Sequence, residues 1–314
     1  MTVFLSTLNQ MAFLMLLILI GYLLMKKKVF PENAAAVISK LENNIFVPAL
    51  VMGTFMNHFT PEKMTQAGSY LLCGLIAVGV SIPFAILCAR FFAKDDYVRK
   101  IYTYGLAFSN FGFMGNAVVS ALFPEIFMEY LIFVLPFWFF IYLWGTPFLL
   151  IPSQGEKKSL LGGMKNLANP MFAGMILGMV IGMAKVPMPS FVGNAVTTLG
   201  NCMSPLAMLL TGITIARIDL KAALKNRSIY MVSAIRLLLM PAAALLVLLA
   251  VRLPYELALC TMCALSMPLG LSTIVVPSAY GKDTTVAAGM ALISHVSSCV
   301  TIPVVFMIFE LLIR

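Results

Sequence analysis

Charged side chains are scarce in this chain of 314 residues, where Asp, Glu, Lys and Arg together make up 11%. Soluble domains carry roughly a quarter of such residues. Hydrophobic residues account for 61% of the chain, and the mean hydropathy is +0.99. This composition excludes an ordinary soluble domain and predicts an all-α protein that crosses a membrane several times.

Histidine and cysteine are also rare, with two and six residues. Every cysteine falls within an apolar run, and the pair Cys260 and Cys263 has no second pair or histidine beside it, which favours structural thiols over zinc or redox chemistry. The sequence has no P-loop, no nucleophile–base arrangement and no paired catalytic carboxylates. We therefore expect a protein that is not an enzyme and that holds no metal or other cofactor.

Apolar runs dominate what remains, and ten of them are long enough to be read as membrane spans. The first ends in three lysines and is long enough to cross the bilayer, so we interpret it as a transmembrane helix and not as a cleaved signal peptide. The predicted spans cover residues 5–25, 34–57, 66–93, 99–123, 126–152, 169–186, 190–215, 228–251, 254–281 and 284–313.

The basic residues test this division. If both termini face outside, sixteen of the 21 Lys and Arg residues lie in inner connections and four in outer ones, with Arg236 left inside a span. This asymmetry follows the positive-inside rule and predicts a multi-pass protein of the cell membrane (inner or plasma membrane) with both termini outside. The net charge of +9 is dispersed over short connections, so the expected partner is the lipid bilayer and not nucleic acid.

The two halves of the chain are faint copies of each other at an offset of 157 residues. Asn44 and Pro48 return as Asn201 and Pro205, and Gly21 returns as Gly178. Because each copy contains five predicted spans, the second must be inverted relative to the first, an arrangement typical of secondary transporters. The predicted units are residues 1–152, a cytoplasmic linker at 153–168, and residues 169–314.

The fourth span of each copy carries residues that weaken a helix. The first holds Asn110 and Asn116 together with Gly112 and Gly115, and the second holds Pro268 and Gly270 followed by Ser272 and Thr273. Broken helices expose amides and the positive ends of helix dipoles at mid-membrane depth, where an anion can bind. The alternative is that the small residues only allow close helix packing and the proline only kinks its helix.

Four other residues are candidates for coupling or gating. Arg236 lies about two turns inside its span, where it either pairs within the bundle, reaches back to the inner surface or takes a role in gating. His295 is either a proton relay or a hydrogen-bonded structural residue. Asn44 belongs to a stripe that either kinks the second span or lines the substrate path, and Glu129 is a candidate for proton coupling.

Together these residues resemble the auxin efflux carrier family, which includes plant PIN-type exporters and bacterial malate or malonate carriers. The resemblance covers essentially the whole chain and rests on residues 20–22, 44–48, 109–115, 267–270 and 279–281. It implies a fold similar to bile-acid symporters, with spans 1, 2, 6 and 7 as a scaffold. Spans 3–5 and 8–10 would form a mobile transport bundle in which spans 4 and 9 cross as broken helices, commonly in a homodimer.

The function expected from this pattern is secondary transport of a small organic anion, such as malate, malonate or an auxin-like acid, by an elevator-type cycle. Asn110 is the residue that the resemblance most directly implies as a substrate contact. Proton coupling, sodium coupling and uncoupled transport all remain open. A membrane receptor or sensor that binds a small carboxylate without moving it is the alternative.

Overall fold

The computed structural model describes residues 2–151, 163–217 and 220–313, of which 86% are helical and none forms a β-strand. Seven helices are long and apolar enough to cross a membrane, and they lie within or close to seven of the ten predicted spans. The other three predicted spans, at 99–123, 169–186 and 254–281, contain shorter helices. A multi-pass membrane protein is therefore supported, whereas the count of ten spans stays a prediction.

The first half contains a long opening helix, a second span with a π-helical segment and a broken fourth span. Its helices are α1 (Thr2–Lys26), α2 (Ala34–Leu41), η1 (Glu42–Phe46), α3 (Val47–His58), α4 (Pro61–Phe92), α5 (Asp96–Ala107), η2 (Phe111–Gly115), α6 (Asn116–Leu122), η3 (Pro124–Ile126), α7 (Phe127–Phe140) and η4 (Ile141–Leu150).

The second half follows a similar order. Its helices are η5 (Lys165–Leu167), α9 (Pro170–Ala184), α10 (Ser190–Ala216), α11 (Leu220–Leu224), α12 (Arg227–Ala234), η6 (Ile235–Leu239), α13 (Met240–Val251), α14 (Tyr255–Leu265), α15 (Ser272–Ala279) and α16 (Thr285–Ile313). Residues 153–162 of the predicted linker lie outside the described residues.

Polar residues at the turns explain where several helices begin. The side chains of Thr60, Asp95, Asn169 and Asn226 each accept a hydrogen bond from a backbone N–H in the first turn of the following helix. Such caps satisfy donors that have no partner within the helix. The apolar runs thus fix the helix interiors, and the polar turn residues fix the starts.

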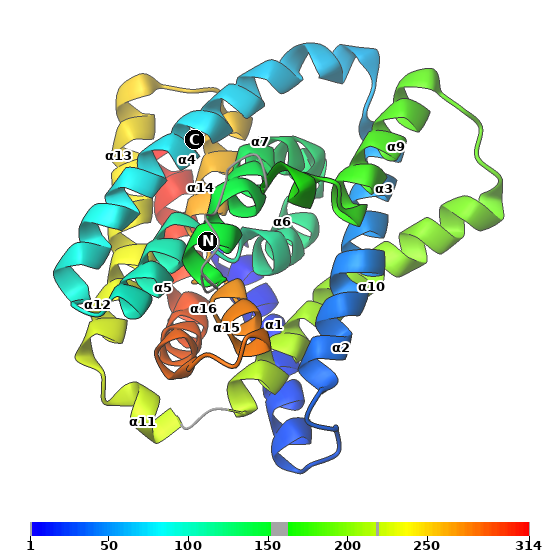
Figure 1. The fold of residues 1–314 in the computed structure, drawn as a ribbon. Helices are drawn as coiled ribbons and strands as arrows, with labels where there is room; N and C mark the ends of the chain where they lie inside the picture. The colour runs from blue at the N-terminus through cyan, green and yellow to red at the C-terminus, as the bar shows by residue number, and fades with distance from the viewer. Residues whose placement is uncertain (1, 152–162, 218–219, 314) are drawn as a thin grey trace.

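The helices form two groups, which Figure 1 shows beside each other. The flank consists of α1, α2–η1–α3, α9 and α10, in which α1 packs on α10, and α3 packs on both α9 and α10. The crossing bundle consists of α4–α7 with η4 and of α11–α16. The two groups meet where α1 contacts α6 and α16, and where α10 contacts η2, α6 and α16.

Glycines bring the flank helices close together. A Cβ atom on Gly21 would lie 2.3 Å from the Leu209 carbonyl oxygen, and one on Gly178 would lie 2.5 Å from the Met52 carbonyl oxygen. The two glycines are 157 residues apart, and so are their two partners. The α1–α10 contact and the α9–α3 contact are therefore built at the offset found in the sequence.

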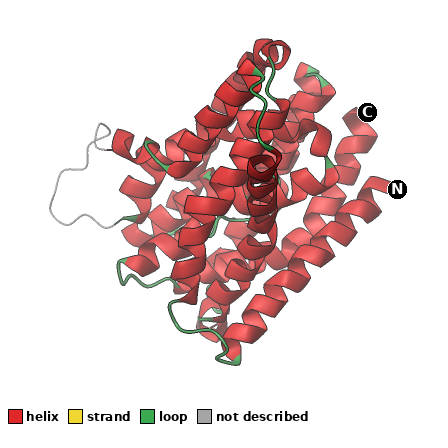
Figure 2. Ribbon diagram, turned by 90° about the vertical axis from the view of Figure 1, so that its right-hand side faces the viewer, coloured by secondary structure: helices red, strands yellow, loops and turns green. Residues whose placement is uncertain are grey.

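The first turns of α1 and the last turns of α16 lie at the same end of the molecule (Figure 2). The prediction that both termini lie on one side agrees with this arrangement. Which side of a membrane that end faces stays a prediction.

Candidate functional site

The first interruption separates α5 from η2. Helix α5 ends at Ala107, Phe108 is extended, and the helix resumes at Phe111, with the Asn110 carbonyl accepting from the N–H groups of Met114 and Gly115 at 3.0 Å each. The interruption therefore covers residues 108–110 and lies before the glycines that were expected to create it.

Gly112 and Gly115 lie inside the resumed helix and serve close packing. A Cβ on Gly112 would lie 2.4 Å from Trp138 Cζ2, and one on Gly115 would lie 2.2 Å from the Tyr130 hydroxyl oxygen. Both aromatic residues belong to α7. These two glycines therefore fit the alternative interpretation, in which small residues allow close helix packing.

The second interruption separates α14 from α15 and is longer. Helix α14 ends at Leu265 and α15 begins at Ser272, with Pro268 and Gly270 in the irregular segment between them. The Thr273 hydroxyl, in the first turn of α15, donates to the Gly270 carbonyl at 2.8 Å. Here proline and glycine lie where the sequence predicted the break.

The two interruptions are hydrogen-bonded to each other. Ser109 and Leu269 form an antiparallel bridge, and the Asn110 N–H donates to the Pro268 carbonyl at 2.7 Å. The Ser109 hydroxyl also donates to the Ala264 carbonyl at 2.8 Å. The two broken helices therefore meet, as the prediction of crossing helices requires.

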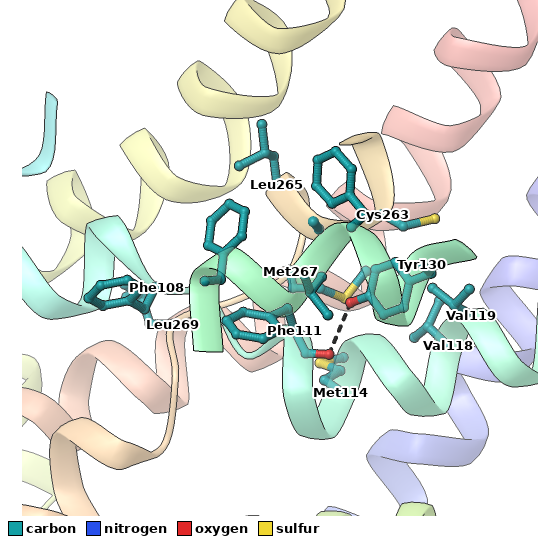
Figure 3. Close-up of a cluster of buried hydrophobic side chains, with 14 of the residues drawn as sticks. Phe108, Phe111, Met114, Val118, Val119, Tyr130, Cys263, Leu265, Met267 and Leu269 are labelled. Atoms are coloured by element: carbon teal, nitrogen blue, oxygen red, sulfur yellow. Dashed lines mark hydrogen bonds between the residues drawn. The ribbon is translucent and has the colours of Figure 1, made fainter. Parts of the chain in front are cut away.

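Apolar side chains enclose this meeting point, as Figure 3 shows for the residues around Phe111 and Met267. The Tyr130 hydroxyl donates to the Phe111 carbonyl at 3.0 Å and so ties α7 to the resumed helix. The crossing is thus a small polar region inside a hydrophobic core.

Arg236 joins the two broken helices at their carbonyl ends. It comes from η6, is 0% exposed, and donates from Nη1 to the Leu106 carbonyl at 3.0 Å and from Nη2 to the Ala264 carbonyl at 3.2 Å. Its Nε donates to the Met267 carbonyl at 3.1 Å. Carbonyls in the last turn of a helix lack internal partners and carry a partial negative charge, so a cation is favoured there.

No carboxylate pairs with Arg236 among the residues that the structure describes. The carbonyl ends of α5 and α14 take that role, since two helix ends together carry roughly one negative charge. Of the interpretations open from the sequence, pairing within the bundle describes the geometry. The side chain does not reach back to the membrane surface.

Helix α16 supplies two side chains that hold the interruptions. His295 Nδ1 lies 2.8 Å from the Ala291 carbonyl, and its Nε2 lies 3.0 Å from Asn110 Nδ2. Because a carbonyl only accepts, Nδ1 carries a hydrogen and Nε2 accepts from the Asn110 amide. The neighbouring Ser294 hydroxyl accepts from the Leu269 N–H at 3.2 Å.

Some polar groups at the crossing have unused capacity. Asn116 Oδ1 and the Ser266 hydroxyl are buried without a hydrogen-bond partner, and the Asn110 amide retains a second hydrogen beyond the one given to His295. Asn110 and Asn116 are only 3% and 2% exposed. In this conformation the crossing is therefore closed, and a ligand reaches it only after a rearrangement.

The electrostatic pattern favours an anion. Arg236 occupies the negative ends of α5 and α14, while the N-terminal ends of the resumed helices, at Phe111 and Ser272, carry partial positive charge. The crossing therefore offers donors and a positive field.

Two predicted residues lie away from the crossing contacts. Asn44 is exposed in η1 and donates to the Lys40 carbonyl of its own helix at 2.8 Å. Glu129 forms an ion pair with Lys63 at the start of α4. Both Lys63 and Glu129 line a cavity of about 270 Å³ that also includes His58, Ser120 and Glu125.

Sequence reasoning missed Tyr130 and Ser109 as parts of the crossing. An isolated tyrosine in an aromatic-rich span carries no periodic signal, and a serine in a helix most often bonds to its own backbone. Their partners lie 19 to 155 residues away in the chain, and only the fold brings them together.

Comparison with known proteins gives one family. The family model described as membrane transport protein, which represents the auxin efflux carriers, matches residues 6–306. No curated protein matches the chain.

Proposed function

The chain belongs to the auxin efflux carrier family and is a membrane transporter, and from this premise we propose that it is a secondary transporter of small organic anions. The cargo class is a carboxylate such as malate or malonate. The observation that carries this proposal is the pair of interrupted helices, whose carbonyl ends are bound by Arg236 and whose resumed N-terminal ends carry partial positive charge.

The binding site is the crossing itself. The free hydrogen of the Asn110 amide, the Ser266 hydroxyl and the first N–H groups of the resumed helices would donate to the carboxylate oxygens. Asn116 Oδ1 would accept from a hydroxyl or a protonated group of the cargo. Pro268, Gly270, Ser272 and Thr273 would shape the opposite wall.

Access would come from movement of the crossing bundle against the flank, in an elevator-type cycle. The closed crossing supports a conformational change as a required step, and the backbone-close packing of α1 on α10 and of α3 on α9 supports the flank as the fixed part. In this proposal the flank is the scaffold of a homodimer in the cell membrane. Both termini would face outside.

The test is uptake of labelled malate and malonate by purified protein in liposomes. Asn110→Ala is expected to abolish uptake while the protein stays monodisperse. A matched control is Asn43→Ala, because Asn43 is an exposed span asparagine whose amide donates to the Ser39 carbonyl of its own helix. We expect this control to transport normally.

Two results would overturn the proposal. Normal uptake by Asn110→Ala would remove the crossing as the binding site. Binding of the acids without any flux would instead favour a receptor.

A further inference from the structure

Two acidic residues are buried among those that the structure describes, and they differ in their surroundings. Glu129 is 3% exposed and is paired with Lys63. Glu42 is 0% exposed, and neither of its carboxyl oxygens has a hydrogen-bond partner. Glu129 was the candidate for proton coupling from the sequence, yet Glu42 is the carboxyl that lacks a counter-charge.

Glu42 is the first residue of η1, which contacts α2, α3, α9 and α10 of the flank. Ala34 and Ala35 of α2 pack in one cluster with Leu210 and Ile213 of α10, and Ile38 packs against that cluster. Residues 34, 38 and 42 are four apart, so in a helix they follow one stripe. The carboxyl of Glu42 therefore extends an otherwise apolar contact between α2 and α10, which Figure 1 shows crossing each other.

The elements packed against η1 bring no charge to this carboxyl. They are α2, α3, α9 and α10. Their titratable side chains are Lys40, which is exposed, His58 at the far end of α3, and Cys202 of α10, while α9 has none. Among the described residues, no ion pair or hydrogen bond reaches the Glu42 carboxyl.

An ionised carboxylate in such a place would strongly destabilise the fold. Burial removes its hydration, and no hydrogen bond or ion pair replaces the lost interactions. Such a group binds a proton instead and becomes neutral. The corresponding residue of the second copy, 157 positions later, is Leu199, which is 38% exposed, so the buried acid belongs to the first copy alone. A carboxyl that is buried without a partner holds a proton that it can release once water reaches it.

We propose that Glu42 binds the coupling proton of the transport cycle, which rests on the proposed function above. The carboxyl holds the proton in the closed conformation and releases it to water in another. Helix α10 links the two sites, because it contacts η1 and also contacts η2, α6 and α16 of the crossing bundle. A shift of the bundle against α10 thus acts on one of the helices that pack against η1, and the neighbours of Glu42, Leu41 and Asn43, are already exposed.

The first experiment reads the proton directly and needs no transport. Infrared spectra of the protein in lipid, recorded over a range of pH, report the C=O stretch of protonated carboxyl groups. Glu42→Gln is expected to remove a band that titrates in the wild type. Glu129→Gln, the matched control at the paired acid, is expected to leave that band in place. Persistence of the band in Glu42→Gln would overturn the proposal.

The second experiment measures coupling in liposomes with an imposed pH gradient. If one proton moves with each substrate, a gradient of one pH unit supports up to about tenfold accumulation, since the proton concentrations differ tenfold. For Glu42→Gln, the substrate concentration inside the liposomes is expected to reach only that outside, a ratio of about one. Exchange of labelled for unlabelled substrate across the membrane is expected to continue. Gradient-driven accumulation by Glu42→Gln equal to that of the wild type would overturn the coupling role.

Folding is checked with a second variant. Glu42→Leu places the residue of the second copy at this position, and both variants are expected to melt at or above the wild-type temperature, because they replace a buried acid by a neutral group. A lower melting temperature for both would show that the carboxyl has a structural partner. If the wild type moves no carboxylate at any pH, the proposed function fails together with the coupling role, while the infrared band still decides whether Glu42 holds a proton.

Discussion

The two interruptions at the crossing are built differently. The first covers three residues, has no proline, and presents the Asn110 side chain, which His295 orients. The second covers six residues, contains Pro268 and Gly270, and is held through its backbone by Ser294 at the Leu269 N–H and by Arg236 at the Met267 carbonyl. The first interruption therefore offers side-chain chemistry, and the second offers a fixed backbone wall.

Arg236 is what the two interruptions share. Its guanidinium donates hydrogen bonds to the carbonyl ends of both α5 and α14. Neither helix can therefore move at that end without losing a hydrogen bond. Residue 79, which lies 157 positions earlier in the first copy, is a glycine. The first copy therefore has no counterpart of Arg236 at that position.

The largest effect is expected from Arg236→Met, which affects both interruptions at once. The Leu106 and Met267 carbonyls lose their charged donor, while the Ala264 carbonyl keeps the Ser109 hydroxyl, and each buried carbonyl left unpaired costs about 1–3 kcal/mol. We expect the variant to lose at least about 2 kcal/mol of stability, seen as a large drop in melting temperature in detergent. Arg236→Lys keeps the charge but not the forked geometry of the guanidinium. Its melting temperature should therefore lie between those of the wild type and Arg236→Met. If Arg236→Met melts at the wild-type temperature, the hydrogen bonds from Arg236 to these carbonyls do not stabilise the two interrupted helices.

A smaller effect is expected from Gly115→Ala, which affects the first interruption alone. The added methyl would lie 2.2 Å from the Tyr130 hydroxyl oxygen, and overpacking of this kind costs about 1–3 kcal/mol. Tyr130→Phe removes that oxygen and should restore part of the stability of Gly115→Ala. Thermal unfolding of the two single variants and of the double variant measures the coupling. Additive losses in the double variant would argue against the contact.

Gly270→Ala is the matched comparison at the second interruption. Its added methyl would lie 3.2 Å from the Phe108 carbonyl oxygen, so we expect a milder loss than at Gly115.

The smallest effect is expected from Ser294→Ala, which affects only the backbone of the second interruption. The Leu269 N–H would lose its acceptor, at about 1 kcal/mol. We expect a small drop in melting temperature and a reduced uptake rate with unchanged cargo preference. A change in preference would mean that Ser294 touches the cargo and does not merely position the wall.

Much of the crossing could be anticipated from residue types alone. Pro268 and Gly270 mark the second interruption, because proline lacks a donor and glycine permits unusual backbone angles. At the first interruption the prediction relied on Gly112 and Gly115, which lie two and five residues beyond the last interrupted residue, Asn110. These two glycines allow Trp138 and Tyr130 of another helix to pack closely against them. No local sequence pattern distinguishes a glycine that breaks a helix from one that allows a neighbouring helix to approach.

The partners of the buried charged residues could not be predicted from the sequence. Arg236 was recognised as costly from its depth in a span, but its carbonyl partners, Leu106 and Ala264, come from two other spans. Glu129 and Glu42 are both acids within predicted spans, and the sequence does not distinguish their surroundings. Only the packing shows that Lys63 pairs with Glu129 and that, among the described residues, no cation pairs with Glu42.

The sequence by itself determined that this protein is helical and membrane-spanning, and it predicted a repeat at an offset of 157 residues and the places where helices are weak. These properties follow from hydrophobicity and backbone preferences, which act over one or two turns. The tertiary structure alone decided which weak points meet, which carbonyls Arg236 binds and which carboxyl is left without a partner. Those outcomes depend on contacts between segments far apart in the chain, because a buried polar group is stabilised only by whatever the fold places beside it.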